Sequence, residues 1–207
     1  MSPNTAPRLE LYVGPMFSAK TERLIAELKR ATYANKRLLV LKPARDTRTD
    51  AFIASRQVDA NGTVTVTETF PATVIQTRED FLRAVSSNEF DVLAIDEAQF
   101  FPLDTPIIDA LGWFGREVRT LLQERRDTPL RILIAGLDTD FANEPFGPVP
   151  GLMALADRVE KLSAVCMVCG SFDAHQSQRI TADSEQVSVG DADMYQARCR
   201  ACFVEPL

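Results

Sequence analysis

The sequence predicts an α/β fold: a parallel sheet flanked by helices, followed by a small C-terminal domain that carries the cysteines. Short apolar segments suited to buried strands alternate with segments whose apolar residues have helical spacing. That alternation is typical of a parallel sheet covered on both faces. A glycine-containing turn follows the first apolar segment, and all four cysteines come after residue 165. We therefore expect two domains, residues 1–162 and residues 163–207.

The elements follow in order along the chain. The expected strands are the apolar segments at residues 9–13, 37–42, 91–96 and 131–135. The expected helices are residues 21–31, 78–87 and 105–126, the last of which Gly112 could interrupt. Residues 51–77 are polar and rich in Thr and Val, and they favour irregular structure with short strands.

Composition and charge exclude several classes of function. The chain has 207 residues, of which 45% are hydrophobic and 25% charged, enough for a buried core. No apolar run approaches the roughly 18 residues of a membrane-spanning helix, and residues 1–7 do not resemble a secretory signal. A net charge of −6 disfavours nucleic acid as a partner. We expect a cytoplasmic protein with no membrane and no nucleic-acid partner.

A candidate phosphate-binding loop joins the first strand to the first helix. It consists of Gly14, Pro15, Met16, Phe17, Ser18, Ala19, Lys20 and Thr21. The loop matches the pattern G-x-x-x-x-G-K-[ST] except that Ala19 replaces the second glycine. Backbone N–H groups of such loops cradle phosphates, while the lysine reaches the β- and γ-phosphates and the threonine hydroxyl binds Mg²⁺. An alanine where φ is often positive carries a cost. The alternative is an ordinary turn with a solvent-facing lysine.

Two carboxylates follow the third expected strand. Asp96 and Glu97 come directly after an apolar segment, at the edge of the sheet where α/β proteins bind ligands. Asp96 could hold a metal ion, and Glu97 could accept a proton from a hydroxyl group. The alternative is that either residue caps the next helix. Together with the phosphate loop, the pair predicts a P-loop NTPase-like domain.

The cysteines form two CxxC pairs. Cys166 and Cys169 are separated by 29 residues from Cys199 and Cys202. Two such pairs typically bind one structural Zn²⁺ ion with tetrahedral geometry. The spacer is longer than the usual 15–20 residues of a zinc ribbon, so we expect it to carry a loop of its own. Two disulfides or a redox dithiol are the alternatives.

Seven motifs resemble the thymidine kinase family, of the cytosolic, zinc-containing, tetrameric type. They occur in family order along nearly the whole chain: Gly14-Pro-Met-Phe-Ser-x-Lys-Thr21, Lys42-Pro-x-x-Asp46-Thr-Arg48, Asp96-Glu-Ala-Gln-Phe-Phe101, Gly136-Leu-Asp-x-Asp-Phe141, Glu144-Pro-Phe-Gly147, Lys161-Leu-x-Ala-Val-Cys166 and Tyr195-x-Ala-Arg-Cys-Arg-x-Cys202. No single motif is specific, but the set is.

The resemblance implies transfer of the γ-phosphate of ATP to the 5′-hydroxyl of thymidine, with Mg²⁺, in nucleotide salvage for DNA synthesis. Glu97 would be the base, and Arg48 would lie near the transferring phosphate. Asp46, Asp96 and Gln99 would serve ATP and Mg²⁺ together with the phosphate loop. The nucleoside would be bound by Met16, Phe100, Leu137, Phe141, Phe146, Ser177, Val189, Gly190 and Tyr195.

The resemblance also implies a substrate lid in the zinc-ribbon-like domain, a homotetramer, and feedback inhibition by thymidine triphosphate. Asp191 departs from the family's usual glycine and puts a carboxylate near the base or sugar. Two alternatives stay open: a kinase for another deoxynucleoside, and a nucleotide-binding protein whose catalysis Ala19 impairs. The acidic charge disfavours a third, a zinc-ribbon module that binds nucleic acid.

Overall fold

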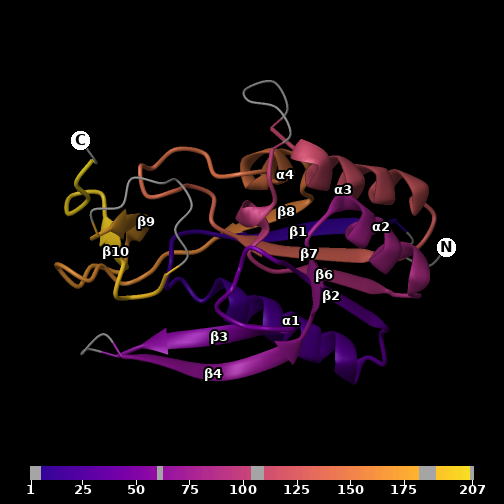
Figure 1. Ribbon diagram of the computed structural model, residues 1–207, viewed down its shortest axis with the longest axis horizontal. Helices are drawn as coiled ribbons and strands as arrows, with labels where there is room; N and C mark the ends of the chain where they lie inside the picture. The colour runs from indigo at the N-terminus through magenta and orange to yellow at the C-terminus, as the bar shows by residue number, and fades with distance from the viewer. Residues whose placement is uncertain (1–5, 60–62, 104–109, 182–189, 206–207) are drawn as a thin grey trace.

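A computed structural model describes residues 6–59, 63–103, 110–181 and 190–205. Its central element is a six-stranded sheet in the order β5-β2-β6-β7-β1-β8, and every neighbouring pair in it is parallel (Figure 1). The strands are β1 (Arg8–Val13), β2 (Leu38–Pro43), β5 (Thr73–Ile75), β6 (Val92–Ile95), β7 (Arg131–Gly136) and β8 (Arg158–Lys161). The predicted parallel sheet is therefore confirmed, and the four expected strands are β1, β2, β6 and β7.

Helices cover both faces of this sheet, as the alternating pattern predicts (Figure 1). They are α1 (Lys20–Tyr33), α2 (Arg78–Ser87), α3 (Gly112–Glu124) and α4 (Val149–Leu155). One buried cluster joins apolar residues of α2, α3 and α4 to one face of the sheet. A second cluster joins Leu24, Ile25 and Leu28 of α1 to the other face. The two clusters are the two layers of the hydrophobic core.

A long hairpin lies beside α1, where the sequence favours irregular structure with short strands. Strands β3 (Phe52–Val58) and β4 (Val64–Pro71) pair in antiparallel register, and Ile53 packs into the cluster around α1. The side chains of β4 are exposed or only partly buried. Val64, Val66 and Phe70 alternate with threonines along β4, but none of its residues is fully buried, so the pattern indicates a strand without a core-facing side.

The helix expected at residues 105–126 is shorter in the structure. α3 begins at Gly112, whose φ of +56° does not continue a right-handed helix, and it ends at Glu124. Residues 110 and 111 form a turn, and the expected part from 105 to 109 lies outside the described residues. Helix α4 and strand β8 were not predicted, because α4 is short and contains Pro150 and Gly151, and three of the four residues of β8 are charged.

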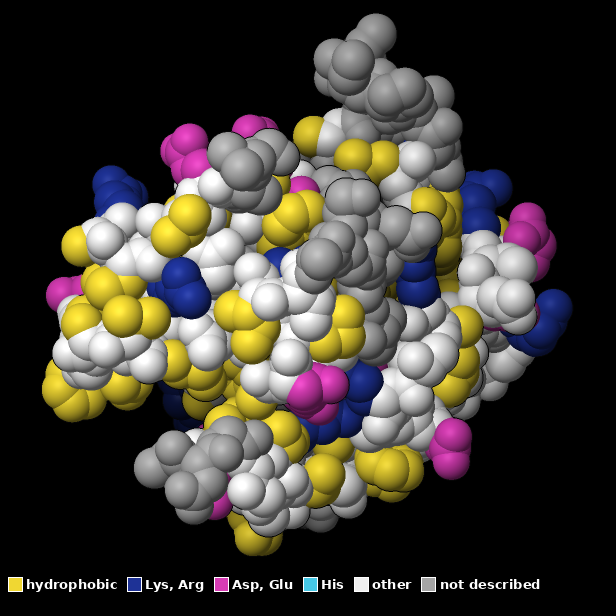
Figure 2. Space-filling view, turned by 60° about the vertical axis from the view of Figure 1, so that its left-hand side comes forward, with side chains coloured by type: hydrophobic (Ala, Val, Ile, Leu, Met, Phe, Trp, Pro, Cys, Tyr) yellow, Lys and Arg dark blue, Asp and Glu magenta, His cyan; other side chains and the backbone are white. Residues whose placement is uncertain are grey.

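The cysteine-bearing part of the chain forms its own small sheet. Strands β9 (Ala174–Arg179) and β10 (Tyr195–Cys199) pair in antiparallel register around a small cluster that includes Cys166 and Cys199. Phe17 packs against this cluster. Figure 2 shows the face that carries this part, where hydrophobic and charged side chains are interspersed. Val168 and Phe172 belong to this part of the chain and are exposed. No helix in the described ranges is long and apolar enough to cross a membrane.

Candidate active site

The site lies at the edge of the sheet where the parallel strands end. The phosphate loop follows β1, the two carboxylates follow β6, and residues 137–147 follow β7. Parallel neighbours end at the same edge, so these three segments meet there. The C-terminal sheet contacts the same edge, because Ser177 Oγ of β9 accepts a hydrogen bond from the backbone N–H of Met16 at 2.9 Å.

The phosphate loop is wound tightly through left-handed backbone conformations. Gly14 has φ +140°, and a Cβ there would fall 2.4 Å from the carbonyl oxygen of Leu162, so only glycine fits. Phe17 and Ala19 have φ of 63° and 60°. The position where the pattern has glycine therefore does have a positive φ, and Ala19 adopts it in spite of its Cβ.

Lys20 closes the loop, and among the residues that the structure describes its ammonium is hydrogen-bonded only to neutral groups. Nζ donates a hydrogen bond of 2.5 Å to the carbonyl oxygen of Pro15 and lies 3.5 Å from Ser18 Oγ. Burial lowers the pKa of Lys20, and the negative charges of Glu97 and Asp96 oppose this shift. An anionic ligand in the loop would also oppose this shift, because a nearby negative charge favours the charged ammonium.

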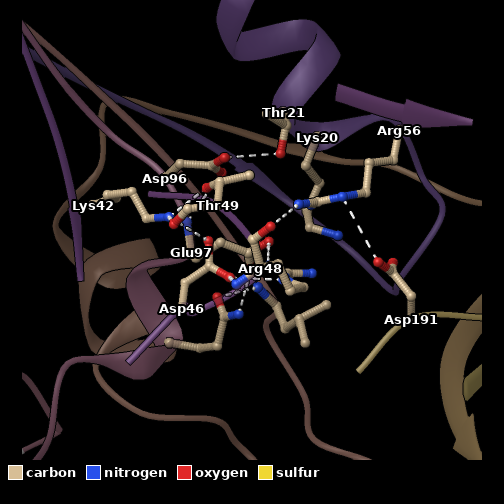
Figure 3. Close-up of polar contacts among 12 residues, drawn as sticks. Lys20, Thr21, Lys42, Asp46, Arg48, Thr49, Arg56, Asp96, Glu97 and Asp191 are labelled. Carbon is tan, nitrogen blue, oxygen red and sulfur yellow. Dashed lines mark hydrogen bonds and ion pairs between the residues drawn. The ribbon is translucent and has the colours of Figure 1, made fainter. Parts of the chain in front are cut away.

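Thr21 and Asp96 meet across the gap between α1 and β6. The Thr21 hydroxyl donates a hydrogen bond of 2.9 Å to Asp96 Oδ2 (Figure 3). Burial and the neighbouring charge of Glu97 raise the pKa of Asp96 to about 7. A hydroxyl and a carboxylate oxygen are hard ligands of the kind that Mg²⁺ prefers, so the pair fits this ion.

Glu97 is held by two neighbours in a left-handed conformation with φ 54°. Its Oε1 forms an ion pair with Arg48, and its Oε2 accepts a hydrogen bond of 2.5 Å from the Gln99 amide (Figure 3). The Gln99 oxygen in turn accepts from the backbone N–H of Leu137 at 3.0 Å. Burial alone would raise the pKa of Glu97, but the charges of Arg48 and Lys20 and the Gln99 hydrogen bond together hold that pKa below its usual range.

A buried network holds Arg48 in place. Asp46 Oδ1 accepts from Arg48 Nε at 2.7 Å, and Asp46 Oδ2 pairs with Lys42 Nζ at 3.1 Å (Figure 3). Lys42 is fully buried and also donates to the Thr49 carbonyl oxygen at 2.7 Å. Asp46 thus contacts Arg48 and Lys42 rather than the phosphate loop. The sequence analysis gave Lys42 no role. The signal that could have found it is a lysine at the end of an otherwise apolar strand.

One cavity joins the phosphate loop to an aromatic wall. Of the predicted nucleoside residues it is lined by Met16, Phe100, Leu137, Phe141, Phe146, Ser177, Gly190 and Tyr195. Arg48, Glu97, Gln99 and Lys20 line the same cavity. The Phe100 and Phe146 rings meet edge to face at 6.2 Å. Val189, the remaining predicted residue, lies outside the described residues.

Further residues line this cavity that the sequence did not predict as ligands. Strand β3 contributes Ala54, Ser55 and Arg56, and Asp140 follows β7. Asp191, which the sequence placed near the base or sugar, also lines it. The β3 residues belong to no nucleotide-binding pattern that we recognised, so only the folded hairpin reveals them.

The four cysteines form a candidate zinc centre. Their sulfur atoms all lie within 4.8 Å of one another, and the Sγ atoms of Cys169 and Cys199 are 3.7 Å apart. A tetrahedral ion with Zn–S bonds of about 2.3 Å separates its sulfurs by about 3.8 Å, so the set fits structural Zn²⁺. Backbone N–H groups outweigh burial and lower the pKa of Cys166 to about 6, which favours the thiolate that binds metal.

The parallel sheet, the loop after β1 and the carboxylates after β6 define an α/β protein of the phosphate-loop class. Comparison with known proteins narrows this class: the family model for thymidine kinase matches residues 7–203. The chain belongs to the thymidine kinase family, and it is an enzyme of that family.

Curated relatives support this assignment over the full length. The thymidine kinase of Mycoplasma mobile is 37% identical over 197 residues, which cover 95% of this chain and 87% of the relative. That of Bacteroides fragilis strain YCH46 is 37% identical over 201 residues, covering 97% and 88%. That of Mesomycoplasma hyopneumoniae strain 7448 is 34% identical over 194 residues, covering 94% of each chain.

Proposed function

We propose that this protein transfers the γ-phosphoryl group of ATP to the 5′-hydroxyl of thymidine in the presence of Mg²⁺. One observation carries the proposal: the Glu97 carboxylate lines a single cavity whose one end is the phosphate loop and whose other end is aromatic. A nucleotide and a nucleoside in the two ends would meet at Glu97. The family membership supports thymidine as the acceptor.

The phosphate loop would bind the phosphates of ATP. Its backbone N–H groups and the N-terminus of α1 supply donors, and Lys20 would exchange the Pro15 carbonyl for phosphate oxygens. Thr21 and Asp96 would hold Mg²⁺, which when bound neutralises charge on the β- and γ-phosphates. Asp46 would act through Arg48, and Gln99 through Glu97.

Glu97 would act as the general base, and Arg48 would couple its basicity to phosphate binding. The 5′-oxygen forms a bond to the γ-phosphorus, the bond to the β–γ bridging oxygen breaks, and the hydroxyl proton passes to Glu97. Arg48 holds the pKa of Glu97 low while the two are paired. When Arg48 turns to the phosphoryl oxygens, where a guanidinium stabilises developing charge, the proton affinity of Glu97 rises.

The C-terminal sheet would complete the nucleoside end of the cavity. Ser177 and Tyr195 line it from β9 and β10, and Gly190 lines it from the segment before β10. The family resemblance implies Val189 as a further nucleoside contact. The zinc ion would hold the cysteine pairs together and take no part in the chemistry. Family membership supports the rest of the proposal: nucleotide salvage, a cytoplasmic homotetramer, and feedback inhibition by thymidine triphosphate.

The test is nucleoside phosphorylation by the purified protein with ATP and Mg²⁺, across thymidine, deoxyuridine, deoxycytidine and the purine deoxynucleosides. We expect turnover selective for thymidine. Glu97→Gln should bind ATP with unchanged affinity and lose about 100-fold or more in kcat. Glu89→Gln, at an exposed carboxylate, is the matched control and should behave as the wild type. Turnover of another deoxynucleoside instead would show that thymidine is not the acceptor. No turnover of any nucleoside would contradict the proposed kinase activity and favour a nucleotide-binding protein.

A further inference from the structure

The β3–β4 hairpin places a second guanidinium in the cavity. Arg56 extends from β3 toward Lys20 and Arg48, and only 14% of its side chain is exposed (Figure 3). It lines the cavity together with the phosphate loop and Glu97. The mechanism above gives Arg56 no role, and it belongs to none of the seven family motifs.

The contacts of Arg56 are weak for a guanidinium at this depth. Among the described residues, its Nη2 donates to the Arg48 carbonyl oxygen at 3.5 Å, and its Nε lies 3.7 Å from Asp191 Oδ2. The first is a long hydrogen bond, and the second is an ion pair beyond hydrogen-bond distance. Arg48 differs, because Asp46 and Glu97 both bind it closely. Arg56 therefore has donors left for a ligand.

Asp191 is a poor permanent partner for this cation. Its carboxylate comes from the segment before β10 and reaches the cavity opposite β3 (Figure 3). Burial raises its pKa, with Arg56 and Arg48 opposing and Glu97 adding to the shift. Because burial and the Glu97 charge disfavour the charged form of Asp191, its ion pair with Arg56 is weak, and a stronger anion can replace it.

We propose that Arg56 is a further phosphate-binding residue of the transfer site, and that Asp191 is the counter-ion it leaves when phosphate arrives. The proposal rests on the proposed function for the identity of the anion, the phosphates of ATP. A guanidinium presents paired donors that match two phosphate oxygens. The single carbonyl oxygen of Arg48, at 3.5 Å, does not satisfy these donors. The competing explanation is a latch, in which the pair merely fastens the C-terminal segment to the hairpin.

Binding of Mg²⁺·ATP without a nucleoside separates the two explanations. We expect Arg56→Gln to raise the Kd for ATP or lower kcat by about tenfold or more, and Arg56→Lys to retain part of the function because it keeps the charge. Asp191→Asn should lower the Kd for ATP about threefold, since the competing anion is gone. In the double variant Arg56→Gln/Asp191→Asn, the second change should have no further effect. Arg83→Gln, at an exposed arginine, is the control.

Two results would overturn the proposal. One is an Arg56→Gln protein that is folded by thermal unfolding and has ATP affinity and kcat within twofold of the wild type. The other is a rise in the thymidine KM alone, equal in Arg56→Gln and Asp191→Asn, which would show a latch. A wild type that binds ATP but phosphorylates no nucleoside contradicts the proposed function, while the ATP affinities still decide the role of Arg56. A wild type that does not bind ATP contradicts both.

Discussion

Replacing Ala19 by glycine should stabilise this protein, although most alanine-to-glycine changes destabilise. Ala19 has φ 60° and ψ 27°, and its side chain is exposed, so its methyl group adds strain without burying surface. The left-handed conformation costs a residue with a Cβ about 1–2 kcal/mol. Glycine removes this strain, but it costs about 0.5–1 kcal/mol of stability because its unfolded chain has more conformational freedom. The net gain is about 0.5–1 kcal/mol.

The matched control is Ala26→Gly in the same segment of chain. Ala26 is also exposed but lies in the interior of α1, where glycine costs about 1 kcal/mol. For a chain of this size, 1 kcal/mol shifts the Tm by about 2–4 °C. Thermal unfolding should therefore show Ala19→Gly above the wild type and Ala26→Gly below it. If both variants unfold at similarly reduced temperatures, the backbone at position 19 is not strained and the reasoning is wrong.

Three further predictions concern the core, the surface and the metal. Phe114→Ala should lower the free energy of unfolding by about 3–5 kcal/mol, because Phe114 is fully buried; a loss below 1 kcal/mol in urea titration would contradict this. The side chain and backbone N–H of Arg37 lower the pKa of Asp91 to about 2, so Asp91→Asn should lower the urea midpoint at pH 7. The difference from the wild type should shrink as the pH falls from about 4 to about 2, because Asp91 of the wild type then becomes protonated. A difference that does not depend on pH would refute this prediction. Removing the zinc ion proposed for the cysteine cluster should raise the thymidine KM more than tenfold and leave the ATP affinity nearly unchanged. Equal losses in both would show that the cysteines support the whole fold.

The central sheet could be predicted because its strands are buried on both faces. β1, β6 and β7 are buried almost throughout, so each appears in the sequence as a continuous apolar segment. The hairpin gives no such continuous apolar segment: β4 is largely exposed, and its Val and Phe residues alternate with threonines. A hydrophobic pattern arises from burial, so it predicts a strand poorly where few of the strand's side chains are buried.

The candidate site divides in the same way. Local patterns placed Lys20, Thr21, Asp96 and Glu97 together, because loops at the ends of parallel strands must meet. The position of Arg56 opposite Asp191 depends on how the hairpin folds over α1, and 134 residues lie between the two in the sequence. The left-handed backbone of Glu97 could not be predicted either, since nothing in its residue type indicates a positive φ.

The hydrogen bond between Met16 and Ser177 joins residues 161 positions apart. During synthesis of the chain, Met16 is therefore made well before its partner. At about 5–20 residues per second, a ribosome needs some seconds to extend the chain from β8 through β10. During that interval the phosphate loop has been synthesised, but the C-terminal sheet that contacts it through Ser177 is incomplete. Under the proposed function, a chain interrupted there would carry the phosphate loop but lack Ser177 and Tyr195, so it could bind ATP without a complete site for the nucleoside.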